Sequence, residues 1–529
     1  MAAGGCGTTH YRESADRQVY DILSNVHKKQ YDSAARYDIE QLAQNPLQDL
    51  PSAQSRLFEI PETLKRFSIP PKLISLEKAL EIAAYHNRSY QNRKEDVYLA
   101  ALALTEEQNE FSSQFGGLLS GFWSGNGDDE FISGEAGLSI GRLLKTGASI
   151  GLNLSTEFLR YLTGDPSRTI SSILAVSIIQ PLWRGAGERI ATENLKQAER
   201  NVVYAVRSFS RFRKSFVVDI ASTHFRVLEQ RAVVENEWRN FKNLALARDR
   251  AQMLATAGRL PEFQADQAKQ NELRAKDRWT RAARLYYERL DSYKLDLGLQ
   301  GDANVDLDNV DLERLVRAGI RHPDIQLEKS VSLALQLRQD LKNVHEQVDD
   351  ARRRIDVAVN NLGADVDLVF NVDVPSKPST HPAELRFDDA SWNAGLDVDL
   401  PLERLGERNE YRRALIDYER AMRNLSLRTD EVKLDVADAW RSLQQASESF
   451  SIQRNSLKLA EQRVDSTTLL LQAGRVDTRD LLESQASLLE AQNALVSSLV
   501  DHTLARLRFR IDTGMLKADE PITTLIYQP

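Results

Sequence analysis

The sequence has little of what several common classes of protein require. Among its 529 residues there is one cysteine, Cys6, so neither an intramolecular disulfide nor a four-cysteine metal site can form. The eight histidines are scattered, and they form neither a His-Glu-x-x-His motif nor an i, i+4 pair. No apolar run approaches the ~20 residues that a membrane-spanning helix needs. The composition therefore predicts no bound metal and no cofactor.

Glycine and proline are also sparse, with 25 and 15 residues, and they cluster in a few places. Neither occurs from Glu188 to Thr256, a stretch that would be ~100 Å long as one helix. A helix of that length cannot be buried in a globule, so the pattern predicts an elongated, mainly helical protein. The net charge of −8 is spread over acids and bases along the helices, which argues against a nucleic-acid partner.

The chain contains an internal repeat. Residues 177–190 read SIIQPLWRGAGERI, and residues 397–411 read DVDLPLERLGERNEY. Each stretch joins a strand-like segment to a long helical pattern through Pro-Leu and a charged turn. We interpret Pro181 and Gly185 as the first strand-to-helix joint. Pro401 and Gly406 mark the second joint in the same way.

The two copies align best at their ends. Gly258 precedes Gly474 by 216 positions, and Gly298 precedes Gly514 by the same number, so this part aligns without a gap. The start of the second copy is less regular. There the stretch DLERLVRAGIRHPDIQ from residue 311 is expected to match SLEKALEIAAYHNRSYQ from residue 75.

The predicted strands alternate between apolar and polar residues. The segments 147–156, 364–374 and 391–402 all show this period of two over about ten residues, the length of a strand in a membrane barrel. A half-buried soluble sheet has the same period. Its apolar face would need a partner to pack against, however, and the only candidates in this chain are long helices whose apolar residues already form coiled-coil seams. One chain has too few strands to close a barrel, so several copies must share one. The first copy holds an extra hairpin at about 134–160.

In this duplicated order the chain resembles the TolC-type outer-membrane efflux and secretion ducts. The resemblance covers roughly residues 70–516 and rests on the order of the motifs, since no single motif is specific. The motifs are LEKALEIAAYHN, QPLWRG and AGRLPEFQADQAKQ in the first copy and LERLVRAGIRHPDI, LPLERLG, AGRVDTRDLLESQASLLEAQNAL and IDTGML in the second.

The resemblance implies a mainly α fold with a β-barrel part, in which three copies form an α-helical barrel continuous with an outer-membrane β-barrel. Such a homotrimer is no enzyme. It contacts outer-membrane lipid, extends far into the periplasm and binds a periplasmic adaptor and an inner-membrane pump. The expected function is the exit duct of a tripartite efflux or type I secretion system. The alternative is a coiled-coil tether of the cell envelope that conducts nothing.

Four regions are expected along the chain: an N-terminal tether at 1–66, the two repeats at 67–300 and 301–516, and a tail at 517–529.

The N-terminal MAAGGCGTTHYRES resembles the end of a lipoprotein signal that lacks its charged and apolar parts. A start codon placed too far downstream, or a trimmed chain, would explain why those parts are missing. Many members of the family are lipoproteins, so acylation of Cys6 is expected. The alternative is an ordinary cysteine in a frayed tail.

Two turns and two acids are the candidate periplasmic tip. The turns Ala257-Gly258-Arg259 and Ala473-Gly474-Arg475 resemble the family's tip turns and are expected to contact the adaptor. Asp480 and Glu483 match positions at which family members carry acids that face the closed duct, and their i, i+3 spacing puts them on one helix face. The alternative for Asp480 is a helix-capping role beside the N-cap residue Asp477.

Enzymatic and nucleotide-binding alternatives find little support. Gly185-x-Gly187 follows a strand and opens a helix, but Ile190 stands where a dinucleotide fingerprint would have its third glycine. The Gly-x-Ser-x-Gly spacing occurs around Ser139 and Ser149, but both serines lie in strand-like alternating segments and not in the strand-to-helix turn that a catalytic serine of this motif occupies.

Overall fold

The computed structural model describes residues 7–31, 39, 72–125, 129–163, 168–301, 303–320, 326–377, 381–400, 402–473, 475–516 and 526. Cys6, Pro401 and Gly474, which the sequence analysis singled out, lie outside these ranges, as do most of the expected tether and tail. Within the described residues, no helix combines the length and the apolar character that crossing a membrane requires.

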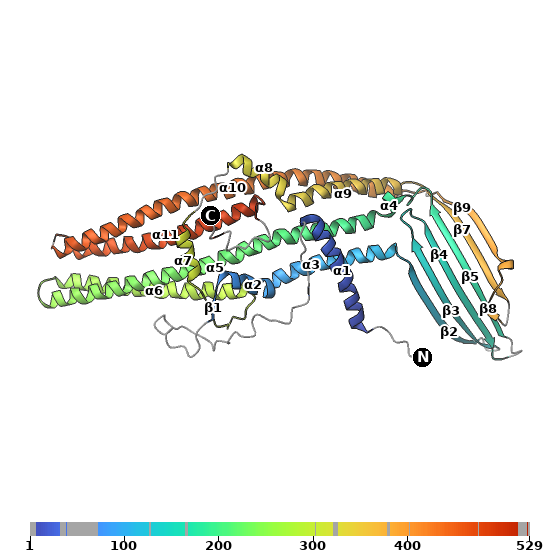
Figure 1. Cartoon of the computed structure of the whole chain (residues 1–529), viewed down its shortest axis with the longest axis horizontal. Helices are drawn as coiled ribbons and strands as arrows, with labels where there is room; N and C mark the ends of the chain where they lie inside the picture. Colours follow the sequence, from blue (N-terminus) through green and yellow to red (C-terminus); the bar gives the residue numbers. More distant parts are fainter. Residues whose placement is uncertain are drawn as a thin grey trace. The chain divides into compact units, whose positions relative to one another are not determined.

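The described chain folds into helices and strands of very different lengths (Figure 1). The α-helices are α1 (Thr8–Tyr31), α2 (Leu76–His86), α3 (Arg88–Glu110), α4 (Glu188–Ala191), α5 (Glu193–Thr256), α6 (Glu262–Asp296), α7 (Val310–Ala318), α8 (Leu327–Leu337), α9 (Gln339–Asn361), α10 (Leu405–Gln472) and α11 (Thr478–Asp512). The strands are β1 (Lys72–Ile74), β2 (Gln114–Gly125), β3 (Glu130–Leu143), β4 (Ser149–Tyr161), β5 (Arg168–Pro181), β6 (Val305–Leu307), β7 (Asp365–Lys377), β8 (His381–Leu385) and β9 (Ser391–Asp399), with a 3₁₀ turn, η2, at Phe387–Asp389.

The chain folds into two compact units, each of which draws on both halves of the sequence. Unit one comprises Met1–Tyr37, Asp96–Arg207 and Lys342–Leu427. Unit two comprises the remaining stretches, Asp38–Glu95, Ser208–Leu341 and Arg428–Pro529. Unit one therefore holds the large sheet and the first turns of α5 and α10, and unit two holds the rest of α5 and α10 together with α6 and α11.

Six long strands form the sheet of unit one, in the order β2-β3-β4-β5-β7-β9, with every pair of neighbours antiparallel. The short β8 pairs with the end of β7 beyond a register shift. The predicted strands are confirmed, including the alternation in 147–156. The expected extra hairpin is β3–β4, two long strands of the first half that have no counterpart in the second half of the described chain.

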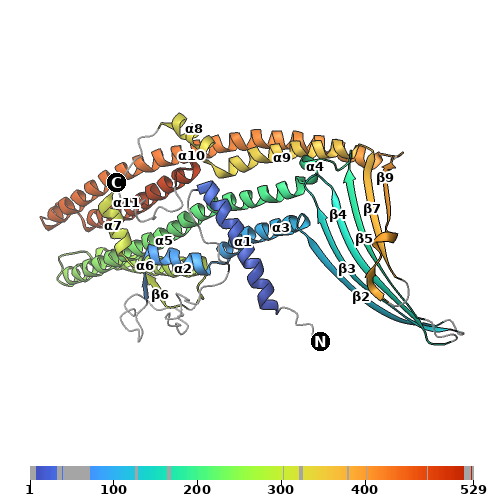
Figure 2. The same cartoon turned by 45° about the vertical axis from the view of Figure 1, so that its right-hand side comes forward.

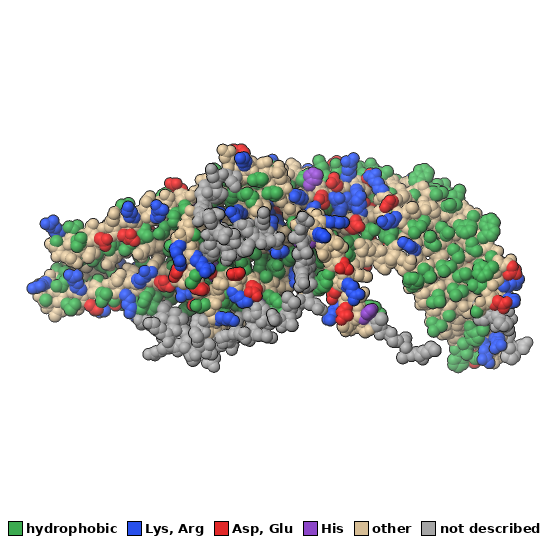
Figure 3. All heavy atoms as spheres, in the orientation of Figure 1, with side chains coloured by type: hydrophobic (Ala, Val, Ile, Leu, Met, Phe, Trp, Pro, Cys, Tyr) green, Lys and Arg blue, Asp and Glu red, His purple; other side chains and the backbone are tan. Residues whose placement is uncertain are grey.

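The two faces of this sheet differ in chemistry. Directly paired residues share a face, so the register can be followed from strand to strand. One row across all six strands is apolar and consists of Phe115, Ile140, Leu152, Val176, Val372 and Trp392. The next row, on the opposite face, consists of Gly116, Ser139, Asn153, Ala175, Asp373 and Ser391. Figure 3 shows hydrophobic side chains gathered over this sheet.

The apolar face is exposed to an extent that is unusual for a soluble protein. Phe115, Leu119 and Trp123 of β2 are 78%, 86% and 74% exposed, and Trp392 of β9 is 69% exposed. Contiguous apolar surface of this kind marks a contact with lipid or with another protein.

Opposite charges link the first turns of α5 to α9 within unit one. Because the two helices are antiparallel, α5 residues taken in ascending order meet α9 residues in descending order. Arg353 Nε lies 2.9 Å from Glu193 Oε2, and Arg200 Nε lies 2.5 Å from Asp350 Oδ1. One step further, Arg207 Nη1 lies 2.8 Å from Glu346 Oε1. Several of these side chains are mostly buried, so this series of ion pairs fixes how α5 is aligned along α9.

Helix α1 packs on unit one through one face. Val19 and Leu23 are fully buried, and Tyr98 of α3 donates a hydrogen bond of 2.7 Å from its hydroxyl to Asp16. Burial, together with Asp16, raises the pKa of Tyr98 well above its usual value. Within the region expected as an N-terminal tether, Thr8–Tyr31 forms a helix.

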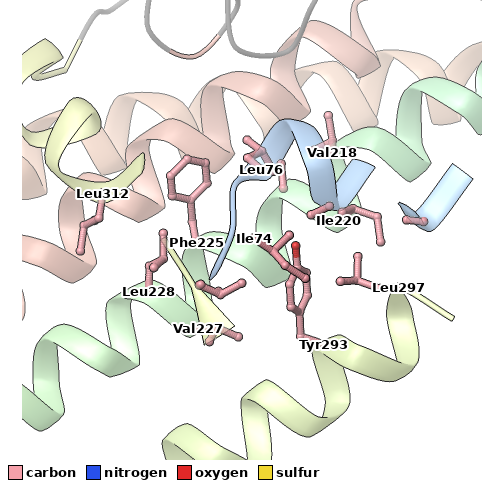
Figure 4. Packing of buried hydrophobic residues seen from close by; sticks show 14 of the residues in the cluster. Ile74, Leu76, Val218, Ile220, Phe225, Val227, Leu228, Tyr293, Leu297 and Leu312 are labelled. Atoms are coloured by element: carbon pink, nitrogen blue, oxygen red, sulfur yellow. The ribbon is translucent and has the colours of Figure 1, made fainter. Parts of the chain in front are cut away.

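The main hydrophobic core of unit two gathers around the middle of α5 (Figure 4). Phe225 and Leu228 of α5 pack with Leu76 at the start of α2. The buried His224 lies 3.0 Å from the Tyr293 hydroxyl and 3.2 Å from Asp311 Oδ2. The same carboxylate oxygen accepts a 2.8 Å hydrogen bond from the backbone N–H of Leu76. This network ties α2, α5, α6 and α7 together.

The start of the second repeat lies elsewhere than the sequence predicted. Helices α8 and α9 have 11 and 23 residues, as α2 and α3 do, and a single residue separates the members of each pair. The structural counterpart of Leu76–His86 is therefore Leu327–Leu337, and the expected match with 311–326 is wrong. Residues 310–318 form the separate helix α7, which follows β6, and β6 pairs in parallel with β1. Short amphipathic helices resemble one another locally, and only the tertiary pairing separates them.

Candidate functional site

Both predicted tip turns lie at the same end of unit two (Figures 1 and 2). The first connects α5, which ends at Thr256, to α6, which begins at Glu262. The second connects α10, which ends at Gln472, to α11, which begins at Thr478. Sequence positions more than two hundred residues apart are thus brought together at one tip.

The two turns end their helices with the same hydrogen bond. The N–H of Arg259 donates to the carbonyl of Leu254 at 2.8 Å, and the N–H of Arg475 donates to the carbonyl of Leu470 at 2.9 Å. This i to i−5 bond belongs to the Schellman motif, which favours glycine in the left-handed region. Gly258 has φ +70°. Ala257, Ala473 and both arginine side chains are exposed, so the backbone is satisfied while the side chains are available to a partner.

The two predicted entrance acids have different local contacts. Asp480 accepts a 3.2 Å hydrogen bond from the N–H of Asp477, and the two residues form a capping box at the start of α11. Glu483 Oε1 lies 3.0 Å from Arg463 Nη2 of α10. Both carboxylates are exposed. Asp480 thus has the capping role that the sequence left open, and Glu483 is part of an ion pair across the hairpin.

The first hairpin carries a cross-helix ion pair at other positions. Arg248 Nη1 of α5 lies 3.2 Å from Glu272 Oε2 of α6. Gln267 and Ala247 occupy the positions that are 216 residues before Glu483 and Arg463. The two hairpins therefore share their backbone turns but not their charge pattern.

The first strand-to-helix joint is a double turn that needs glycine. Gly185 and Gly187 have φ +77° and +90°, a region that other residues rarely adopt. The Gly185 N–H donates to Asn360 Oδ1 at 2.8 Å, and Asn360 Nδ2 donates to the Trp183 carbonyl at 3.1 Å. Pro181 ends β5 just before this turn. The end of α9 therefore holds the turn that follows β5.

The second joint is built differently. Gly406 is the second residue of α10, so it lies in the helix and not in a turn like that of Gly185. A Cβ at this position would meet nothing within 4 Å. The Arg404 guanidinium donates a hydrogen bond to the carbonyl of Leu362, at the end of the α9 segment. The two joints thus occupy equivalent positions in the repeat, as expected, but their backbone conformations differ.

A buried charge network at the bend between α8 and α9 was missed from the sequence. The side chain of Arg338 is fully buried, and it donates to Asp340 Oδ2 and Asp435 Oδ2 at 2.8 Å each. Arg428 Nη2 donates to the same Asp340 oxygen at 2.7 Å, and Arg211 lies 3.5 Å from it. Burial alone would raise the pKa of Asp340, but these arginines together hold it well below its usual value. No local sequence signal indicates contacts between residues so far apart.

Comparisons with known proteins agree with the predicted resemblance. Residues 330–509 match the family model described as outer membrane efflux protein. This stretch is therefore similar to the outer membrane efflux protein family. No curated protein gives a match.

Solved structures extend the likeness to most of the chain. VceC of Vibrio cholerae, an outer membrane protein, has 15% identity and a TM-score of 0.62 over 83% of this chain and 96% of its own. The CmeC outer membrane channel of Campylobacter jejuni has 13% identity and a TM-score of 0.61 over 90% and 97%. The open-state MtrE outer membrane channel of Neisseria gonorrhoeae has 14% identity and a TM-score of 0.59 over 83% and 88%. At these identities the likeness shows a shared fold, and the predicted fold class is confirmed.

Proposed function

We propose that this chain forms the outer-membrane exit duct of a tripartite efflux or type I secretion system. The observation that carries the proposal is the two-faced sheet of unit one, which continues through both joints into the long helices of the hairpins. An exposed apolar face suits lipid, and a polar face suits a water-filled lumen. The family match over 330–509 supports the same class. The function is transport, not catalysis.

The proposed duct is a homotrimer in the outer membrane. The edge strands β2 and β9 each leave a row of backbone groups without a partner in the described chain, and lipid offers those groups no hydrogen bonds. Further copies of the chain supply the missing partners. The long helices form the periplasmic part of the duct, and their tip turns receive the periplasmic adaptor and the inner-membrane pump.

The polar face of the sheet suggests which solutes the lumen favours. Seven carboxylates lie on this face: Glu135, Glu157, Asp365, Asp367, Asp373, Asp397 and Asp399. Within the paired stretches of the six long strands, no lysine or arginine lies on the same face. Glu135 stands directly opposite Glu157, and Asp367 opposite Asp397. Such like-charge pairs are unfavourable in a sheet unless water or cations screen them, so the lumen should favour cations.

Acylation of Cys6 is the proposed membrane anchor. The motivation is the AAGGC segment, in which small residues precede the cysteine as they do at lipoprotein cleavage sites. A diacyl anchor holds a protein at the membrane far more firmly than one chain does. Mass spectrometry of protein extracted from bacterial membranes should find acylated Cys6, and an unmodified thiol in that protein would refute the anchor.

A matched pair of substitutions tests whether the sheet meets lipid. Leu138 and Ser139 are neighbours on β3, and Leu138 lies on the apolar face, where it is 65% exposed. An arginine on a lipid-facing strand costs about 2–4 kcal/mol near the bilayer midplane, whereas lumen positions tolerate charge. Leu138→Arg should sharply lower the amount of protein in the outer membrane, and Ser139→Arg should leave it near normal. Equal effects of the two substitutions would contradict a membrane sheet.

Reconstitution separates the duct from a coiled-coil tether. Purified full-length protein in a planar bilayer should give ion conductance in discrete steps, and light scattering in mild detergent should give the mass of three chains. A clean monomer, or a trimer without conductance, would favour the tether.

A further inference from the structure

The two halves of the chain supply unequal numbers of strands. The second half provides two long strands to the sheet, β7 and β9. The first half provides four, because β3 and β4 are inserted between β2 and β5. A strictly duplicated chain would provide two strands from each half. The described chain therefore has six long strands in one sheet where the repeat alone would give four.

The additional hairpin is an integral part of the sheet. It pairs with β2 on one side and with β5 on the other, in unbroken register along β3 and β4. The turn between β3 and β4 also packs on the first strand-to-helix joint. The Gly187 N–H donates to the carbonyl of Thr146 at 3.0 Å, and a Cβ on Gly147 would lie 2.6 Å from the carbonyl oxygen of Gly185. A hairpin seated this closely on the strand-to-helix joint cannot swing out of the sheet without breaking the joint.

The edge strand β2 lacks the features that protect free edges in soluble proteins. Strand β2 has twelve residues and contains neither a charged residue nor a proline. Charges, prolines and bulges usually keep such edges from pairing with other chains. Because all neighbours are antiparallel and the long strands are even in number, β9 of one copy and β2 of the next also run antiparallel. The edge that fits β2 is therefore β9 of a second copy of this chain.

We propose that three copies of this chain close a barrel of eighteen strands, six from each copy. This inference rests on the proposed trimeric duct and goes beyond it, because the hairpin β3–β4 alone sets the difference from a ring of twelve strands. With strands ~4.8 Å apart and tilted by about 40°, the ring diameter is roughly 36 Å for eighteen strands and roughly 24 Å for twelve. The hairpin therefore widens the outer-membrane end of the duct by about half. Such a barrel has the width at which strands enclose an aqueous channel.

Cross-linking tests the pairing between copies. On β2 the even-numbered residues lie on the polar face and the odd-numbered ones on the apolar face. On β9 the polar face carries Asn393. Chains with Asn393→Cys combined with a cysteine at an even β2 position (Gln114, Ser120 or Ser124) should include at least one that forms a disulfide between copies. Combinations with an odd position (Phe115, Leu119 or Trp123) should form none.

The opposite result is expected when Trp392→Cys, on the apolar face, replaces Asn393→Cys. Disulfides should then form with odd-numbered β2 positions and not with even-numbered ones. The parent chain, which keeps only Cys6, controls for background disulfides. Cross-links that ignore parity, or no cross-link from any combination, would overturn the pairing of β2 with β9.

Electron cryo-microscopy of the purified full-length protein counts the strands directly. Eighteen strands in the ring are expected. A chain that lacks residues 130–161 keeps residues 126–129 and 162–167 as the connection from β2 to β5, and its ring should have twelve strands. A ring of twelve strands in the parent protein, with β3–β4 outside it, would overturn the inference while leaving a conducting trimer intact. Absence of any ring and of conductance would instead refute the proposed duct.

Discussion

Asn87 and Arg338 hold the same backbone conformation at equivalent bends in the two halves of the chain. Asn87 follows α2 with φ −67° and ψ 121°, and Arg338 follows α8 with φ −65° and ψ 120°. A glycine packs against each bend, Gly298 beside Asn87 and Gly514 beside Arg338. The two glycines have φ +75° and +76°. The repeat is therefore kept at the level of backbone contacts even where the side chains differ in size and charge.

These close approaches predict a graded loss of stability on substitution to alanine. A Cβ on Gly298 would lie 2.3 Å from the carbonyl oxygen of His86, which belongs to the backbone and cannot rotate away. A Cβ on Gly514 would lie 2.9 Å from the Leu337 side chain. With the cost of a positive φ added, Gly298→Ala should lose about 3 kcal/mol and Gly514→Ala about 2 kcal/mol. Denaturant unfolding of the purified protein measures both losses.

Gly258→Ala is the control for the cost of the backbone conformation alone. Gly258 has φ +70°, and a Cβ there would meet nothing within 4 Å. Its loss should be about 1 kcal/mol. Equal losses at all three glycines would show that the contacts at the bends contribute nothing.

The charge network at Arg338 predicts a large effect from a small change. Asp340→Asn keeps the shape of the side chain and removes a charge that three arginines share, one of them fully buried. Arg338 keeps its bond to Asp435, so the expected loss is that of hydrogen bonds to a charged group, about 1.5–3 kcal/mol each. The exposed pair of Asp438 with Arg441 gives the matched control, Asp438→Asn, with an expected loss of about 0–1 kcal/mol. Similar unfolding midpoints for the two variants would contradict the assignment.

The same network predicts an acid dependence. The pKa of Asp340 is depressed in the folded protein, so its contribution is fully present above the unfolded pKa of about 3.9 and is lost as the pH falls through the lower folded value. The difference in stability between the parent protein and Asp340→Asn should stay constant from neutral pH down to about pH 4 and shrink below it. A difference that already shrinks between pH 7 and pH 5 would assign the effect to another group.

Local signals determined how much of this fold the sequence could predict. Gly258 and Gly298 mark helix ends because a positive φ favours glycine, and that requirement is visible in a single sequence. The alternation along β4, β7 and β9 is visible for a similar reason, since a period of two follows from the strand itself. The capping pair of Asp477 and Asp480 is equally local and was foreseen in part.

What could not be predicted depends on partners that are distant in the sequence. Nothing near Arg338 indicates that Asp435 and Arg428 lie beside it. The true start of the second repeat, at Leu327, was hidden because the short helix α7 has a similar amphipathic pattern and differs only in its place beside β6. In the same way, the ion pair between Glu483 and Arg463 depends on how α10 and α11 meet.

The tip turns predict a contact that capping does not need. Gly258 ends its helix whether or not a partner binds. The hydrogen bonds that end the two helices use the backbone of Arg259 and Arg475 and leave both side chains exposed. Replacing both by glutamine should leave the thermal stability of the trimer unchanged and weaken cross-linking to the adaptor several-fold. Replacing the exposed Arg284 of α6, which pairs with Glu288 away from the turn, is the control. Unchanged cross-linking and transport in the double variant would end the contact hypothesis.

The entrance acids predict a change of ion selectivity that separates their two roles. In a trimer, Asp480 and Glu483 would together place six carboxylates around the entrance, and such a ring attracts cations and binds polyvalent ones as blockers. Asp480→Asn removes charge while its side-chain oxygen can still accept from the Asp477 N–H, so the capping box survives. Combined with Glu483→Gln it should lower cation selectivity and abolish block by trivalent ions, while the trimer still forms.

Arg463 gives the opposite test of the same ring. Its guanidinium lies 3.0 Å from the Glu483 carboxylate and neutralises part of its field. Arg463→Gln should therefore raise cation selectivity and strengthen trivalent block, which no capping role of either acid would produce. Because the pair is exposed, its loss should cost less than about 1 kcal/mol of stability, so altered conductance would not reflect unfolding. Single-channel recordings compare this variant with the Asp480→Asn, Glu483→Gln double variant in one lipid mixture, and cation selectivity should change in opposite directions. Unchanged selectivity in both variants would mean that Asp480 acts only in the capping box and Glu483 only in its ion pair.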